Sequence, residues 1–219
     1  MKRFICITVL MVLLVLTVSA SAQHRAGVIG GFNFANAKDE LYYHNNRTFP
    51  GFGGVFDLDL KRNFSLHITP MFIRKGWGGD KYDASDRSEV KFSYLEIPFF
   101  LKIDLASTIR PYVFTGPWLA FLLSSEVETE ENGIMFTGDI KHITKSLDIG
   151  FGYGAGISLP VKNFAVFLEF RSTIGSDINK GGEIEFESDF GNITTTIENS
   201  QVKHKDTRIL FGITLPVKW

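Results

Sequence analysis

Apolar side chains recur at every second position over long stretches of this chain, most clearly in residues 207–219, TRILFGITLPVKW. One set of alternate positions holds Ile209, Phe211, Ile213, Leu215, Val217 and Trp219. The intervening set includes Arg208, Gly212, Thr214 and Lys218. A period of two predicts a β-strand whose two faces differ chemically.

The same pattern predicts eight strands, at 24–34, 49–60, 64–77, 90–103, 110–124, 146–159, 164–176 and 207–219. The gaps between them alternate between long polar segments (35–48, 78–89, 125–145 and 177–206) and short ones (61–63, 104–109 and 160–163). This alternation is typical of outer-membrane barrels, in which an even strand number leaves both termini in the periplasm. We therefore expect an all-β fold, an eight-stranded antiparallel transmembrane β-barrel.

Glycines indicate which face meets lipid. In the sixth predicted strand one side holds Leu147, Ile149, Phe151, Tyr153, Ala155, Ile157 and Leu159. The other side holds Asp148, Gly150, Gly152, Gly154, Gly156 and Ser158. A soluble lipocalin-like barrel would turn the bulky side inward and expose the glycines to water, where they weaken a strand without benefit. Inside a narrow barrel glycines leave room for charged neighbours, so the bulky side is expected to face hydrocarbon.

Composition supports an exported membrane protein. Phe and Gly are equally abundant at 21 each, and 23 Lys+Arg against 24 Asp+Glu leave no basic excess that would favour nucleic acid. A charged start at Lys2 and Arg3, an apolar run over 4–18 and a small-residue site at 20–22 predict a signal peptide, 1–22, before a barrel domain, 23–219. An uncleaved anchor is the alternative, but the run is short for a membrane span. The single cysteine, Cys6, lies in this segment, so the mature chain has no disulfide or thiol chemistry.

Charged residues on predicted inward positions form a candidate polar network in the lumen. It comprises Asp57, Asp59, Glu96, Lys102, Asp148, Glu169, Arg171 and Arg208, and His67 and Lys218 share its face. Both signs are present, and the interior of an eight-stranded barrel is just wide enough for side chains. We expect a plug of paired charges. A narrow ion or solute path along glycine-rich walls is the alternative.

A lipid-modifying enzyme or a protease is a further alternative, since some outer-membrane barrels carry His with Ser, Asp or Glu near the outer rim. His44, His142 and His204 fall in predicted external loops beside Ser and acidic residues. Their spacing singles out no triad and lacks the clustering of a metal site. We expect no catalytic residues, no cofactor and no metal.

Residues 94–102, YLEIPFFLK, resemble a strand of the PorT-like outer-membrane β-barrel family of Bacteroidota. Pro111-Tyr112-Val113 with Gly116-Pro117, and Asp148-Ile149-Gly150 with the glycines that follow, are also similar. The resemblance implies the fold and the outer-membrane location. Some members of that family are linked to type IX secretion, but most have no assigned activity.

Proteins of this architecture resemble one another in ending on an aromatic residue, which the outer-membrane assembly machinery reads. The resemblance implies an insertion signal made of Ile213, Leu215, Val217 and Trp219. Trp219 is alternatively a residue of the interfacial aromatic girdle, for which Trp77, Tyr112, Trp118 and Tyr153 are further candidates.

The long loops are the expected seat of specific function. Residues 183–187 and 193–197 alternate like strands around a hairpin at 189–192, and Asn132-Gly133 predicts a second hairpin within 126–140. Such ribbons either bind a partner by edge addition or are plain extensions. We expect a monomer that contacts outer-membrane lipid, lipopolysaccharide and the assembly machinery, with a possible extracellular protein or ligand at the loops. Its expected role is envelope structure, surface binding or accessory work in secretion, with a small-solute pore as the leading alternative.

Overall fold

The computed structural model describes residues 24–38, 45–61, 63–80, 87–105, 108–131, 134–178, 182–188, 191–197 and 203–217. Within these ranges the chain forms β-strands and one short 3-10 helix, η1 (Lys141–Ile143). The strands are β1 (His24–Lys38), β2 (Asn45–Lys61), β3 (Phe64–Ile68), β4 (Met71–Asp80), β5 (Arg87–Asp104), β6 (Arg110–Glu131), β7 (Ile134–Asp139), β8 (Leu147–Val161), β9 (Phe164–Asp177), β10 (Gly182–Ser188), β11 (Gly191–Ile197) and β12 (Lys203–Val217). No helix in the described ranges is both long and apolar enough to cross a bilayer.

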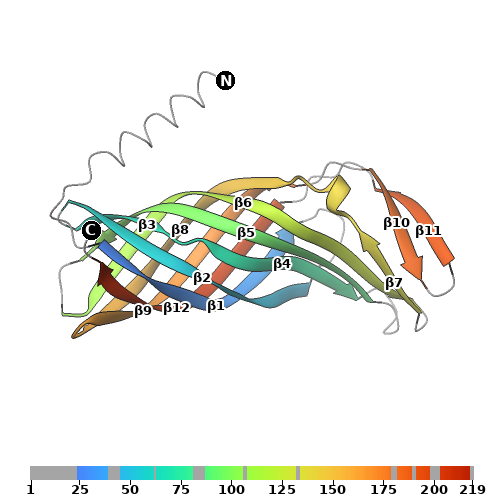
Figure 1. The fold of residues 1–219 in the computed structure, drawn as a ribbon. Coiled ribbons are helices and arrows are strands. Elements are labelled where there is room, and N and C mark those ends of the chain that lie inside the picture. Colours follow the sequence, from blue (N-terminus) through green and yellow to red (C-terminus); the bar gives the residue numbers. More distant parts are fainter. Residues whose placement is uncertain are drawn as a thin grey trace, which may run out of the picture.

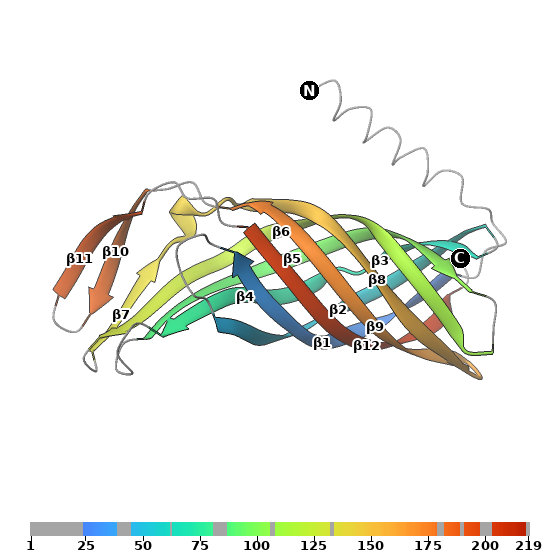
Figure 2. The same cartoon turned by 180° about the vertical axis from the view of Figure 1, so that it is seen from behind.

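Antiparallel pairings join the strands into a closed ring (Figures 1 and 2). β1 pairs with β2, β2 with β3 and β4, these two with β5, β5 with β6, β6 with β8, β8 with β9, β9 with β12, and β12 again with β1. Because β3 and β4 lie end to end and together occupy one strand position, the ring has eight strand positions. Each strand of the ring has a neighbour on both sides, so its backbone N–H and C=O groups can form hydrogen bonds where water is absent. The expected all-β antiparallel barrel is confirmed.

The third predicted strand, 64–77, is not continuous. It divides at Thr69-Pro70 into β3 and β4. Proline has no N–H to donate to a ladder, so a strand that contains it is interrupted or confined to an irregular position. The carbonyl of Pro70 still accepts a hydrogen bond from the Gly54 N–H at 2.9 Å, which keeps β2 attached across the break.

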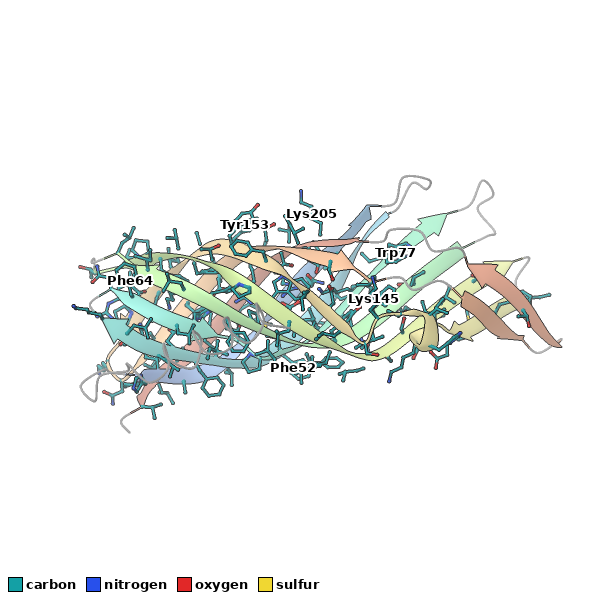
Figure 3. The ribbon with its side chains drawn as sticks, turned by 90° about the horizontal axis from the view of Figure 1, so that it is seen from above. Phe52, Phe64, Trp77, Lys145, Tyr153 and Lys205 are labelled. Carbon is teal, nitrogen blue, oxygen red and sulfur yellow. The ribbon has the colours of Figure 1, made fainter. Side chains whose placement is uncertain are left out.

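Outward and inward positions alternate along the strands of the ring, as the alternation of apolar residues in the sequence predicts. Phe151 in β8 and Phe211 in β12 are 54% and 58% exposed, whereas Asp148 and Arg208, at positions of opposite parity in the same strands, are fully buried. Figure 3 draws Phe52 and Tyr153 projecting away from the barrel wall. The outer surface of the barrel is therefore apolar, and the polar side chains lie inside.

Aromatic rings of β6 fill the space that the β8 glycines leave, and this differs from the expectation that charged neighbours occupy it. Tyr112 lies opposite Gly156, Phe114 opposite Gly154 and Trp118 opposite Gly150. A Cβ added at Gly150 would lie 2.5 Å from a ring carbon of Trp118, and one added at Gly154 or Gly156 would overlap the facing ring. Glycine beside an aromatic residue on the next strand is a compact packing unit within a sheet.

The same pairing corrects the predicted aromatic girdle. Tyr112 and Trp118 are 1% exposed and lie inside the barrel. Trp77 is half-buried and packs on Phe92, with ring centroids 5.4 Å apart. Tyr153 is exposed on the outer face and remains a girdle candidate. Trp219 and the predicted signal peptide, 1–22, lie outside the described residues.

Beyond one end of the barrel the sheet continues as a β-extension. β6 turns back into β7, with Glu131 opposite Ile134, so part of the predicted loop 125–145 is strand. β10 pairs with β7 and with β11, where Phe186 lies opposite Ile193. Both predicted hairpins are confirmed, although their turn residues 132–133 and 189–190 lie outside the described ranges. The other barrel end carries the start of β1 and the end of β12, where His24 lies opposite Val217 (Figure 1).

Candidate functional site

One ion-paired cluster fills the barrel half nearer to His24 and Val217. This terminal-end network consists of Asp57, His67, Lys102, Glu169 and Arg171, all buried. The Asp57 carboxylate lies 2.5 Å from His67 Nδ1 and accepts a hydrogen bond from Lys102 Nζ at 2.9 Å. His67 Nε2 lies 3.3 Å from Glu169, whose carboxylate accepts bonds from Arg171 Nε and Nη2 at 3.0 and 2.5 Å. Every charge in this cluster therefore has an opposite charge beside it.

A second cluster fills the other half of the barrel. This outer-end network consists of Lys75, Glu96, Asp148, Asp206 and Arg208, with side chains that are all fully buried. Arg208 donates to both oxygens of Glu96, and its Nη2 lies 2.9 Å from Oε2. Lys75 Nζ lies 3.3 Å from Glu96 and 3.2 Å from Asp206, with Asp148 at 4.0 Å. A bidentate Arg–carboxylate pair is among the strongest polar contacts available in a dry interior.

The structure brings together seven of the eight residues predicted for the lumen network. Asp57, Lys102, Glu169 and Arg171 lie in the terminal-end network, and Glu96, Asp148 and Arg208 in the outer-end network. Asp59 differs, because its side chain is 31% exposed and its nearest cation is Arg25 at 3.6 Å. Lys218 lies outside the described residues.

Sequence reasoning missed Arg25, Lys75 and Asp206. Lys75 shares the inward parity of His67, so the alternation already contained the signal for it. Asp206 has the parity of Arg208, but the predicted strand began at 207, one residue after it. Arg25 lies on β1, where the alternation is less regular, and its Nη2 lies 3.4 Å from Asp104.

The buried charges balance if His67 carries a proton. Five carboxylates are buried in the described part of the chain (Asp57, Glu96, Asp148, Glu169 and Asp206), against four Lys and Arg side chains (Lys75, Lys102, Arg171 and Arg208). The two ring nitrogens of His67 face two different carboxylates. An imidazolium has two donors and meets this geometry. His67 therefore lies between the two carboxylates of the terminal-end network, whereas the surplus carboxylate belongs to the outer-end network.

Aromatic rings separate and cover the charged groups. Lys102 Nζ lies 4.1 Å from the centroid of the Tyr112 ring, and Lys75 Nζ lies 4.3 Å from that of Trp118. The guanidinium of Arg171 lies 4.9 Å from the Phe100 ring, which stacks on Phe114. Cation–π contacts of this kind stabilise desolvated cations. The rings therefore pack against the charged groups of both networks inside the barrel.

Apolar residues cover the barrel end that faces the β-extension. Leu122, Val127, Ile140, Ile143 and Ile178 are buried and belong to the same apolar cluster as Trp118. The segment that carries Ile178 is held in place because its carbonyl accepts a hydrogen bond from the Lys145 N–H at 2.8 Å. The filled interior thus continues into a small apolar core at this end.

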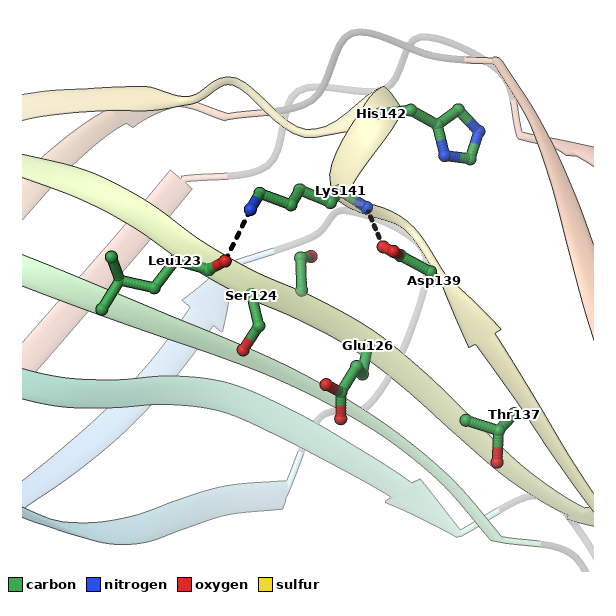
Figure 4. Close-up of a pocket in the computed structure, with 8 residues that line it drawn as sticks. Leu123, Ser124, Glu126, Thr137, Asp139, Lys141 and His142 are labelled. Atoms are coloured by element: carbon green, nitrogen blue, oxygen red, sulfur yellow. Dashed lines mark hydrogen bonds between the residues drawn. The ribbon is translucent and has the colours of Figure 1, made fainter.

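A polar pocket of about 620 Å³ lies on the surface of the β-extension (Figure 4). It is lined by Leu123, Ser124, Ser125, Glu126, Thr137, Asp139, Lys141 and His142. Lys141 bridges its walls, because Nζ donates to the Leu123 carbonyl and the backbone N–H donates to Asp139, both at 2.7 Å. On neighbouring β5, Lys91 donates to Glu128 at 2.7 Å, and this hydrogen bond raises the pKa of Lys91 above its ordinary value.

The hydrogen bonds of the pocket are structural in character. The Ser125 hydroxyl lies 3.2 Å from the Thr144 hydroxyl, which in turn donates to the Ile140 carbonyl at 2.8 Å. Asp139 holds the backbone at Lys141. In Figure 4 the His142 ring points away from Ser124 and Glu126. Across the described ranges, no three His, Cys, Asp or Glu side chains are placed to share a metal ion. His44 lies outside the described residues, as does the side chain of His204.

Comparison with known proteins gives a family and a fold. The sequence matches the family described as "Outer membrane protein beta-barrel domain" over residues 20–175. Among solved structures, a major outer membrane protein from Thermus thermophilus is 11% identical with a TM-score of 0.51, covering 90% of this chain and 100% of that one. OprG from Pseudomonas aeruginosa is 9% identical with a TM-score of 0.51, covering 90% and 97%. No curated protein matches the sequence. The apolar outer face, the closed ring and the family match agree: the chain belongs to the outer membrane protein β-barrel domain family and is an outer-membrane β-barrel.

Proposed function

We propose that this outer-membrane barrel is not an enzyme or a pore, and that it binds a partner through its β-extension. The observation that carries the proposal is the contrast between a lumen filled by two ion-paired networks and a sheet that continues beyond the barrel. Charges that are paired and desolvated stabilise a core but offer no path to a solute. Among the described residues the β-extension presents specific polar chemistry, in its pocket and along its last strand, β11.

The proposed orientation places the β-extension outside the cell and both termini in the periplasm. Support comes from the short connections at the barrel end that carries His24 and Val217, such as the one between β8 and β9. Outer-membrane barrels have short periplasmic turns and longer external loops. Protease digestion of intact cells tests this, since cleavage in residues 177–206 is expected before cell lysis. Cleavage only after lysis would contradict the orientation.

Several further roles follow as parts of the same proposal. The apolar face contacts outer-membrane lipid and lipopolysaccharide, and the barrel acts as a monomer. Ile213 and Leu215 are exposed on this face, in keeping with an insertion signal that ends at Trp219. Deleting Trp219 should leave the protein unassembled and protease-sensitive, whereas normal heat-modifiable barrels would remove that role. The PorT-like motif at 94–102 keeps an accessory role in secretion among the candidates.

Planar-bilayer recording of the purified protein tests the sealed lumen, and the expected record is silent. A matched variant, Trp118→Ala with Tyr112→Ala, removes two rings from the lumen and should raise conductance if it still migrates as a folded barrel. Steady unitary conductance of the unmodified protein would contradict the proposal. Incubation with lipid A, phospholipid and peptide substrates should give no turnover, and turnover that His142→Ala abolishes would instead establish an enzyme.

The pore alternative has one observation in its favour. Asp148 Oδ2, Asp206 Oδ1 and Trp118 Nε1 are buried polar atoms that make no hydrogen bond to the described part of the protein. Such groups can be satisfied by ordered water in a polar interior. A file of water through the outer-end network would give a small conductance that Asp148→Asn and Asp206→Asn alter, and the same recording detects it.

A further inference from the structure

We propose that β11 is the binding edge of the β-extension and that it accepts an extended, positively charged polypeptide segment as an added strand. This inference rests on the proposed surface-binding function and names the site and the class of partner. It is carried by the pairing of the strands, by the residues of β11 and by the charge of the sheet that β11 ends.

The first step is the order of the strands. Outside the barrel ring, β6, β7, β10 and β11 follow one another as hydrogen-bonded neighbours, and β11 is the last strand of the series. It pairs with β10 over its full length, from Gly191 opposite Ser188 to Ile197 opposite Gly182. Within the described residues β10 is its sole strand partner. Figures 1 and 2 show β10 and β11 at the far end of the molecule, well beyond the barrel.

The second step is the sequence of this edge. Natural edge strands usually carry Lys, Pro or a bulge that prevents another strand from pairing. The seven residues of β11, GNITTTI, contain no proline and no charge, and their register with β10 is uninterrupted. Ile and Thr are β-branched residues that favour extended backbone. Within the described residues this edge therefore lacks the usual protection, and the backbone donors and acceptors that do not pair with β10 are available to a further strand.

The third step is charge, which selects among possible occupants. Residues 126–139 and 182–197 contain nine acidic residues and no Lys, Arg or His, and Lys91 of the adjoining β5 pairs with one of the nine, Glu128. A second copy of the same sheet would bring the same negative charge to the edge, and phosphate groups of lipid A would be repelled as well. A segment rich in Lys or Arg is attracted and steered to the edge, most strongly at low ionic strength.

The test uses the whole barrel in lipid nanodiscs and a fluorescent synthetic nonapeptide of alternating Lys, Thr and Val. Two matched peptides share its length: one has Glu in place of Lys, and one keeps Lys but has a central Pro. We expect binding of the first peptide alone, weakened roughly tenfold between about 0.05 M and about 0.5 M salt. Equal binding of the Glu or Pro peptide would overturn the inference.

Protein variants locate the contact on β11. Because N–H groups alternate in direction along a strand, one of Thr194→Pro and Thr195→Pro removes an outward donor and leaves the pairing with β10 intact. That variant should lose roughly tenfold in peptide affinity while keeping its heat-modifiable barrel. If neither variant loses affinity for the peptide, the inference is overturned. It is also overturned if the unmodified protein forms dimers that these substitutions dissociate, because the edge would then bind a second copy of the chain.

A cross-link fixes the register. Cysteine is absent from residues 23–219, so Thr194→Cys offers a unique thiol in the mature chain. A peptide with Cys at its centre should form a disulfide with this variant and not with Tyr153→Cys on the lipid face, since strand neighbours meet the distance that a disulfide needs. Equal reaction at both sites would overturn the inference. If the protein shows no conductance in planar bilayers and binds no peptide, only the assignment of β11 as the binding edge is refuted. If it shows unitary conductance, the proposed function itself is refuted.

Discussion

The barrel interior and the β-extension differ in how their strand edges and their charged side chains are paired. Inside the ring each strand has two neighbours, and buried acidic and basic groups contact one another in two compact networks. In the described part of the β-extension the sheet ends on β11, and acidic residues outnumber basic ones although Lys91 of β5 pairs with Glu128. A buried charge is tolerated when it has a partner and is costly when the partner is removed, whereas unmatched exposed charge attracts a partner. The comparison assigns stability to the interior and recognition to the extension.

The largest effect should follow from breaking a buried pair. Glu96→Ala removes the carboxylate that pairs with Arg208 through both oxygens and also contacts Lys75, and leaves only the Asp206 contact that the two cations share. We expect the free energy of unfolding to fall by about 3–5 kcal/mol. Urea titration of the protein in lipid vesicles measures it. Glu96→Leu with Arg208→Met is the control, and should recover much of the loss because no charge is left alone. A loss below about 1 kcal/mol for the single variant would place the network in water.

A charge on the lipid face should cost somewhat less. Replacing Ile149 or Phe211 by Arg near the middle of the bilayer is expected to cost about 2–4 kcal/mol, since both side chains are exposed on the outer face. The same titration applies. Thr137→Arg in the β-extension is the control, and it should be nearly neutral because this side chain lines a surface pocket. Equal costs at Ile149 and Thr137 would contradict the assignment of the faces.

Two glycines of β8 should differ in how much an added methyl group destabilises the barrel. A Cβ at Gly154 would overlap the backbone carbonyl of Phe170, which cannot move alone, so Gly154→Ala should cost about 1–3 kcal/mol. At Gly152 the nearest atoms are side-chain atoms of Phe100 and Thr173, so Gly152→Ala should cost less. Thermal unfolding of the two variants side by side gives the order, and the reverse order would refute the aromatic–glycine packing described for β6 and β8.

The smallest effect is expected at an ion pair of the β-extension. Lys91→Met removes the contact with Glu128 and should change the free energy of unfolding by about 0–1 kcal/mol, because the side chains are partly exposed. The hydrogen bond raises the pKa of Lys91 in the folded protein, so its contribution is complete below the unfolded pKa of about 10.4 and is lost as pH rises through the folded value. A difference between the two proteins that grows with pH would be incompatible with this sign.

Local alternation was enough to predict the faces and most strand positions, because side chains of a strand point to opposite sides whatever its partners are. It also placed Glu96 and Arg208 on inward positions. It did not predict that Tyr112 and Trp118 lie inside, since an aromatic residue suits both a girdle and a core. Only the register between β6 and β8, which sets Tyr112 against Gly156, distinguishes the two. That register joins residues far apart in the chain, and a pattern read along one strand does not contain it.

Fluorescence quenching by brominated phospholipids tests the central claim, that the apolar face meets lipid and the rings of β6 lie inside. Trp118 lies opposite Gly150, so it is at nearly the same depth as Ile149 but on the other side of the wall. In a background with Trp77→Phe and Trp219→Phe, Trp118 is the only tryptophan, and Ile149→Trp with Trp118→Phe moves the reporter to the outer face. Strong quenching is expected for the tryptophan at position 149, and little for Trp118. Strong quenching of Trp118 with none at 149 would contradict the central claim.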